Sequence, residues 1–95
     1  MSGTSVDGID AALVEIDGAG YDLTLTLVAG ESRSYRASLQ QAILQAAAGD
    51  GITLEDLASL DDAIALEFAQ VAQVLIDRCG PVDLIASHGQ TVFHR

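Results

Sequence analysis

The sequence contains no lysine, and its four basic residues are all arginines: Arg33, Arg36, Arg78 and Arg95. Chemistry that depends on a lysine amine is therefore excluded for this chain. Acidic residues outnumber basic ones 14 to 4, and the formal net charge at pH 7 is −10. Because lysine and arginine bind the phosphates of nucleic acids and of anionic lipids, we expect neither a nucleic acid nor a membrane surface as a partner.

Cysteine is almost as scarce. The single residue, Cys79, cannot form an intrachain disulfide, so a reducing compartment is the simpler prediction. No apolar run reaches the ~18–20 residues that span a bilayer. The N-terminus lacks the basic region and apolar stretch that mark a signal peptide. We therefore expect a cytoplasmic protein.

The chain has 95 residues, of which 49% are hydrophobic, and this is enough for one small domain. A domain of this size buries only roughly 60–65% of the surface that its unfolded chain exposes. So apolar a sequence should therefore leave apolar surface uncovered when it folds alone. We expect a piece of a larger protein; the alternative is a small complete domain that forms a homodimer.

Two apolar segments around a glycine-rich turn predict a β-hairpin over residues 9–28. Residues 9–16 are a mostly apolar run suited to a buried strand, and residues 17–20 contain two glycines that allow a tight turn. Leucine alternates with threonine over residues 23–27, which is the period of a strand with one solvated face. Residues 29–35 are compatible with a strand or a loop.

Two helices should follow the hairpin. Ser38 and Gln41 fit a capping box for the first helix, which should end at the glycines of residues 49–51. Thr53 is placed to cap a second, long helix over residues 54–79. That helix has an apolar stripe with a spacing of three or four residues, which predicts core packing. The stripe consists of Leu57, Leu60, Ile64, Phe68, Val71 and Leu75.

Gly80 and Pro81 should stop the long helix, and residues 82–87 then predict a short buried strand before a polar loop. A hairpin followed by a helical crossover to a further strand predicts an α/β fold with a mixed sheet. Cys79, at the helix end, should be a buried small hydrophobe, since its spacing from the two histidines matches no zinc pattern.

The glycine-bounded segment Gly3, Thr4, Ser5, Val6, Asp7, Gly8, Ile9 and Asp10, here called the phosphate loop, carries the groups that could bind an oxyanion. Glycines let backbone amides converge on phosphate oxygens, and the hydroxyls of Thr4 and Ser5 are further donors. The loop is no Walker A motif, because Ile9 and Asp10 stand where lysine and serine or threonine are needed.

The carboxylates of Asp7 and Asp10 would repel a bare phosphate. A Mg²⁺ ion held through water between carboxylate and phosphate turns this repulsion into attraction, so the pattern indicates a Mg-nucleotide loop. Two alternatives remain at this point. The segment could be a plain turn shaped by Asp7 and Gly8, and Asp10 could serve only to accept hydrogen bonds from serine or threonine hydroxyls.

A second polar segment, His88, Gly89, Gln90 and Thr91, follows the predicted strand and is here called the acceptor loop. Ligands of open α/β sheets bind beyond strand ends, and the amide of Gln90 can both donate to and accept from sugar hydroxyls. The alternative is that His88 and Gln90 only tie the loop to the sheet.

The segments 1–10 and 87–94 resemble the two signatures of anhydro-N-acetylmuramic acid kinases, a family within the actin-like ATPase and sugar-kinase superfamily. The resemblance implies a ribonuclease H-like fold and makes residues 1–95 a partial N-terminal lobe of a two-lobed enzyme. In the family, the segment from Gly3 to Asp10 is a hairpin turn that holds ATP phosphates, and the strand before it contributes to the sheet.

The resemblance also implies an activity: with ATP and Mg²⁺, the family opens the 1,6-anhydro bond of anhydro-N-acetylmuramic acid and phosphorylates O6 in cell-wall recycling. It makes His88, Gly89 and Gln90 a wall of the sugar cleft. The family's catalytic base is an aspartate beyond Arg95, so no catalytic base is assigned within this chain. The alternatives are another sugar or acetate-type kinase of the superfamily, or an inactive nucleotide-binding or interaction fragment.

Overall fold

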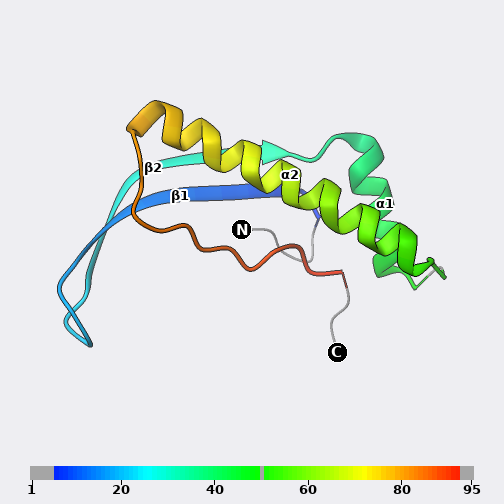
Figure 1. Cartoon of the computed structure of the whole chain (residues 1–95), viewed down its shortest axis with the longest axis horizontal. Helices are drawn as coiled ribbons and strands as arrows, with labels where there is room; N and C mark the ends of the chain where they lie inside the picture. Colours follow the sequence, from blue (N-terminus) through cyan, green and yellow to red (C-terminus); the bar gives the residue numbers. More distant parts are fainter. Residues whose placement is uncertain (1–5, 50, 93–95) are drawn as a thin grey trace.

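The computed structural model describes residues 6–49 and 51–92. Four elements follow one another: strands β1 (Gly8–Asp17) and β2 (Thr24–Ser34), then helices α1 (Ala37–Ala47) and α2 (Leu54–Cys79). Helix α2 contacts both strands and α1, and the segment after it returns beneath β1 in the view of Figure 1. The α/β class is as predicted, but the expected mixed sheet is not formed by the described residues, whose only sheet is the antiparallel pair β1-β2. Within the described residues, no helix is both long and apolar enough to cross a membrane.

The hairpin is confirmed and is longer than expected. Its antiparallel register runs from Gly8 opposite Ser34 to Asp17 opposite Thr24, so residues 29–34, which the sequence left open, belong to β2. A shift of register between Leu13 and Val14 marks a bulge, which sharpens the local twist. At the turn, Gly18 has a φ of 95°, a conformation that favours glycine.

The predicted capping box of the first helix is wrong. Helix α1 begins at Ala37, with Arg36 as its N-cap and no side-chain cap. The amides of Leu39 and Gln40 already donate to the carbonyl of Arg36, at 3.1 and 3.0 Å. Ser38 therefore lies inside the first turn rather than before it, where its hydroxyl cannot act as an N-cap.

The cap of the second helix is confirmed. The Thr53 hydroxyl accepts from the amide of Asp56 at 3.0 Å, and Glu55 and Asp56 lie in the first turn, where negative charge is favourable. Arg78 lies in the last turn and pairs with the carboxylate of Glu31 on β2. Helix α2 is thus capped by Thr53 at its N-terminus and bound to the hairpin by an ion pair near its C-terminus.

Replacing Thr53 with alanine should lower the free energy of unfolding by about 1 kcal/mol, because the amide of Asp56 loses its partner. Ser38→Ala is the matched control: it removes the hydroxyl that makes no cap, and it should change that free energy by less than about 0.5 kcal/mol. Urea unfolding followed by circular dichroism measures both. Equal losses for the two variants would contradict the assigned cap.

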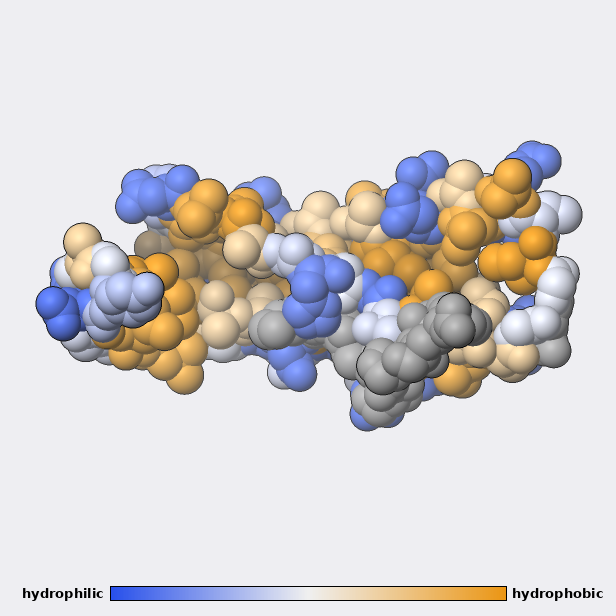
Figure 2. All heavy atoms as spheres, turned by 90° about the horizontal axis from the view of Figure 1, so that it is seen from below, coloured by the Kyte–Doolittle hydropathy of each residue, from blue (hydrophilic) through white to orange (hydrophobic). Residues whose placement is uncertain are grey.

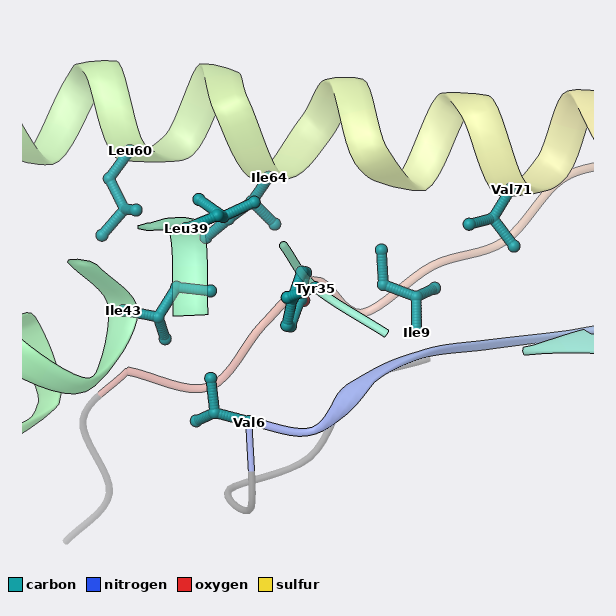
Figure 3. Close-up of a cluster of buried hydrophobic side chains, with 8 residues drawn as sticks. All are labelled: Val6, Ile9, Tyr35, Leu39, Ile43, Leu60, Ile64 and Val71. Atoms are coloured by element: carbon teal, nitrogen blue, oxygen red, sulfur yellow. The ribbon is translucent and has the colours of Figure 1, made fainter. Parts of the chain in front are cut away.

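The core lies between α2, α1 and the base of the hairpin (Figure 3). Four of the six predicted stripe residues of α2 are buried, whereas Phe68 is partly buried and Leu57 is exposed. The buried cluster brings together residues from every described element except β2, together with one residue from each connecting segment at the hairpin base. It consists of Val6, Ile9, Tyr35, Leu39, Ile43, Leu60, Ile64 and Val71.

The far half of the hairpin extends beyond this core, and apolar residues gather on that end of the molecule (Figure 2). The prediction that residues 9–16 form a buried strand therefore holds only near the base: Ile9 is buried, but Val14 and Ile16 are exposed. On β2, Leu25 and Leu27 are also exposed, although the alternation predicted one covered face. No described helix or further strand covers the far half of the hairpin.

The strand predicted over residues 82–87 is not formed. These residues carry no ladder, and Leu84 is 82% exposed. They run near β1, but a hollow of about 730 Å³ lies between them, lined from one side by Leu13 and Val14 and from the other by Val82 and Leu84. A strand needs a neighbour within hydrogen-bonding distance, and residues 82–87 pair with neither described strand.

The predicted burial of Cys79 is also wrong, because this free cysteine is exposed. It is the last residue of α2, directly before Gly80, the residue that ends the helix.

Candidate functional site

The described part of the phosphate loop begins with a strained residue. Val6 has a φ of 55°, which is costly for a β-branched side chain, typically about 1–3 kcal/mol. Core packing and one hydrogen bond hold Val6 in place. Its side chain is only 1% exposed, and its carbonyl accepts from the Gln40 side-chain amide at 2.8 Å. The surrounding core and α1 thus impose a fixed conformation on the point where the loop enters β1.

The next two residues tie the loop to the end of β2. The carbonyl of Asp7 accepts from the Tyr35 amide at 3.4 Å, and Gly8 is paired with Ser34. A Cβ at Gly8 would lie 2.9 Å from the Ser34 Cα and would overlap the carbonyl oxygen of Arg33. Glycine is required at this position by the close approach of two backbones, while the side chain of Asp7 is exposed.

Ile9 and Asp10 lie on opposite faces of β1. Ile9 is buried in the core, so only its backbone can serve a ligand. Asp10 is exposed, and its Oδ1 accepts from the Ser32 hydroxyl at 2.6 Å across the hairpin. The alternative considered for Asp10, a hydrogen bond to a hydroxyl, is thus present, although the donor is on β2 rather than in the loop.

The remaining members of the predicted loop, Gly3, Thr4 and Ser5, lie outside the described residues. Among residues 6–49 and 51–92, no three acidic, histidine or cysteine side chains gather where they could hold a metal ion. Mg²⁺ is commonly held by one or two carboxylates together with the phosphates of its nucleotide. The exposed carboxylates of Asp7 and Asp10 fit that manner of binding.

Tyr35, which donates to Asp7 of the phosphate loop, also links one member of the acceptor loop to it. Gln90 is half-buried, and its Oε1 accepts from the Tyr35 hydroxyl at 2.8 Å. His88 is exposed. Between them, the amide of Gly89 donates to the Ser87 hydroxyl at 3.2 Å. Gln90 also borders a hollow of about 320 Å³ between α2 and residues 87–92.

Sequence reasoning missed the two residues that hold these loops, Tyr35 and Gln40. Tyr35 stands in the stretch that was compatible with a strand or a loop, and Gln40 stood within the proposed capping box. The available signal was weak: a tyrosine between a strand and a helix in a sequence with only four aromatic residues, two Tyr and two Phe. Their partners are far away in the sequence, so no local pattern reveals them.

The fold and the site together define an α/β chain in which the described end of the phosphate loop, residues 6–10, is linked through Tyr35 to a second polar loop. Comparison with known proteins makes the class specific. The family model described as "Anhydro-N-acetylmuramic acid kinase" matches residues 1–95, and the chain belongs to this family.

Curated relatives of that name match along the whole chain. The protein of Trichormus variabilis is 57% identical over 95 residues, and that of Synechocystis sp. is 55% identical; in both cases all of this chain is covered, and 24% of the relative. The protein of Acaryochloris marina is 53% identical over 96 residues, covering all of this chain and 25% of the relative. The chain thus spans about a quarter of the length of the curated relatives it matches.

Proposed function

We propose that this chain supplies the phosphate loop of an ATP-dependent kinase that opens the 1,6-anhydro ring of anhydro-N-acetylmuramic acid and phosphorylates O6. The product is N-acetylmuramic acid 6-phosphate, an intermediate of cell-wall recycling. The observation that carries the proposal is the match of the family over all 95 residues, both predicted loops included. The clamped base of the phosphate loop, at Val6 and Gly8, supports it because a preorganised loop is what phosphate binding needs.

We further propose that residues 1–95 are part of the N-terminal lobe of a two-lobed, cytoplasmic enzyme. Two observations support this: the chain spans about a quarter of its relatives' length, and apolar side chains of the hairpin are exposed. The rest of the polypeptide is then expected to cover the hairpin and to supply the catalytic base. A second copy of the chain, as a homodimer, is the alternative cover.

In this proposal the loop binds ATP mainly through backbone amides from Gly3 to Gly8, assisted by the hydroxyls of Thr4 and Ser5. Asp7 and Asp10 would hold Mg²⁺ through its water ligands. The metal supplies the positive charge that a loop without lysine cannot provide. Gln90 and Gly89, with His88 farther out, would form a wall for the sugar.

Asp10→Asn tests this arrangement in the full-length polypeptide. Asparagine can still accept from Ser32, so the hairpin should keep its shape, whereas the charge available to Mg²⁺-bound water is lost. We expect kcat/KM for ATP to fall by about tenfold at limiting Mg²⁺ and to recover at excess Mg²⁺, because one hydrogen bond to a charged group is weakened. Phosphorylation of anhydro-N-acetylmuramic acid, with acetate as a control acceptor, is the measurement.

Two further variants separate the causes. Gly3→Val places a branched side chain where phosphate oxygens approach the backbone, so its loss of activity should not recover with Mg²⁺. Asp17→Asn removes an acid from the far end of β1 and should leave the kinetics unchanged. Unchanged ATP turnover in both Asp10→Asn and Gly3→Val would exclude this loop as the phosphate site.

A further inference from the structure

One buried tyrosine contacts both predicted loops. Tyr35 lies between the end of β2 and the start of α1, and its side chain is buried in the core near Val6 and Ile9 (Figure 3). Its amide donates to the carbonyl of Asp7 in the phosphate loop at 3.4 Å, and its hydroxyl donates to Oε1 of Gln90 in the acceptor loop at 2.8 Å. Segments at opposite ends of the chain thus meet at a single residue.

The direction of the hydroxyl bond follows from the partners of Gln90. The side-chain Nε2 of Gln90 donates to the carbonyl of Thr91 at 2.9 Å. A carbonyl only accepts, so the NH₂ group must face Thr91 and the amide oxygen must face Tyr35. The Tyr35 hydroxyl is therefore the donor, and it selects one of the two orientations of the Gln90 amide.

We propose that Tyr35 is a positioning residue that sets the acceptor loop relative to the phosphate loop, its hydroxyl fixing the amide of Gln90, a residue of the proposed sugar wall. The inference rests on the proposed function and deepens it. Tyr35 touches neither ATP nor sugar in this account; it acts through Gln90. The two contacts are separable, because the bond to Asp7 uses the main chain and the bond to Gln90 uses the side chain.

This separation gives Tyr35→Phe a distinctive kinetic effect. Phenylalanine keeps the ring in the core and the main-chain bond to Asp7, and it removes only the hydroxyl. In the full-length polypeptide, kcat/KM for the anhydrosugar should fall about five- to tenfold, while KM for ATP should stay within about twofold of the wild type. A hydroxyl that only stabilised the core would lower the urea midpoint and leave both kinetic constants unchanged.

Two more variants complete the experiment. Tyr21→Phe is the matched control, since Tyr21 is fully exposed at the hairpin turn and should leave every constant unchanged. Gln90→Leu should impair the anhydrosugar constants, and adding Tyr35→Phe to it should cause no further loss, because the tyrosine acts through Gln90. Amide hydrogen exchange should rise over residues 87–92 in Tyr35→Phe and stay unchanged over residues 6–10.

The outcomes are distinguishable. An active wild type whose Tyr35→Phe variant keeps its anhydrosugar kinetics, or loses activity additively with Gln90→Leu, overturns the positioning role and leaves the proposed function intact. A wild type that transfers no phosphate from ATP to the anhydrosugar overturns the proposed function, and the positioning role with it. A lower kcat/KM for the anhydrosugar with little change in KM for ATP supports the positioning role of Tyr35, provided that Tyr35→Phe adds no further loss to Gln90→Leu.

Discussion

Replacing Gly8 with alanine should open the base of the hairpin and abolish most of the phosphotransfer proposed for the full-length polypeptide. The added Cβ would meet the backbone at Arg33 and Ser34, and backbone cannot move aside as a flexible side chain can. Because Gly8 and Ser34 form the end of the ladder, relief of this overlap requires the strands to separate there. We expect the free energy of unfolding to fall by about 3 kcal/mol, at the upper end of the usual cost of overpacking.

Gly30→Ala is the control for that experiment. Gly30 lies on the partner strand, and its added Cβ would be 3.7 Å from the carbonyl oxygen of Ala11, an ordinary contact. This variant should stay within about 1 kcal/mol of the wild type and keep its activity. Urea unfolding and ATP-dependent phosphorylation measure both variants. Similar losses at the two glycines would show that backbone approach at Gly8 is not what the loop requires.

Ile43→Ala should destabilise the protein about as strongly as Gly8→Ala. Ile43 is fully buried, with an exposed fraction of 0%, and it belongs to the cluster that joins α1, α2 and the entry to the phosphate loop. Deleting its side chain removes apolar burial and leaves a cavity, at a cost of about 2–5 kcal/mol. Since Val6 packs in the same cluster, its strained conformation should relax and ATP turnover should fall with stability.

The adjacent residue supplies the comparison for Ile43. Leu44 is on the same helix but is 47% exposed, so Leu44→Ala changes a similar volume without making a buried cavity. Its cost should remain below about 1 kcal/mol. Equilibrium urea unfolding gives both values. A Leu44→Ala loss equal to that of Ile43→Ala would contradict the placement of the core on one face of α1.

Local patterns predicted the elements whose causes are local. The alternation of leucine and threonine and the glycines at the turn were enough for the hairpin, and the spacing of the stripe together with Thr53 was enough for α2. Ser38 had a suitable pattern too, but Arg36 already accepts the first amides of α1. A cap depends on where the preceding strand ends, and the sequence left that boundary open.

Features that depend on distant partners could not be predicted in this way. Residues 82–87 have the composition of a strand, yet a strand also needs an edge to pair with, and in the described structure they pair with neither strand of the hairpin. The positive φ of Val6 is equally invisible in a sequence, because valine normally avoids it and only the core and Gln40 impose it. The chemistry of the residues offered candidates for both loops, but it gave no sign of the tyrosine that contacts both.

The length of α2 has a mechanical consequence. A helix of 26 residues extends for about 39 Å, and this one contacts α1 and both strands, with residues 87–92 beside it. A helix bends little over such a distance, so the segments that contact α2 should keep their positions relative to one another. If this part of the protein moves, the hairpin base and the acceptor loop should therefore move together as one body, and the distance between them should change little.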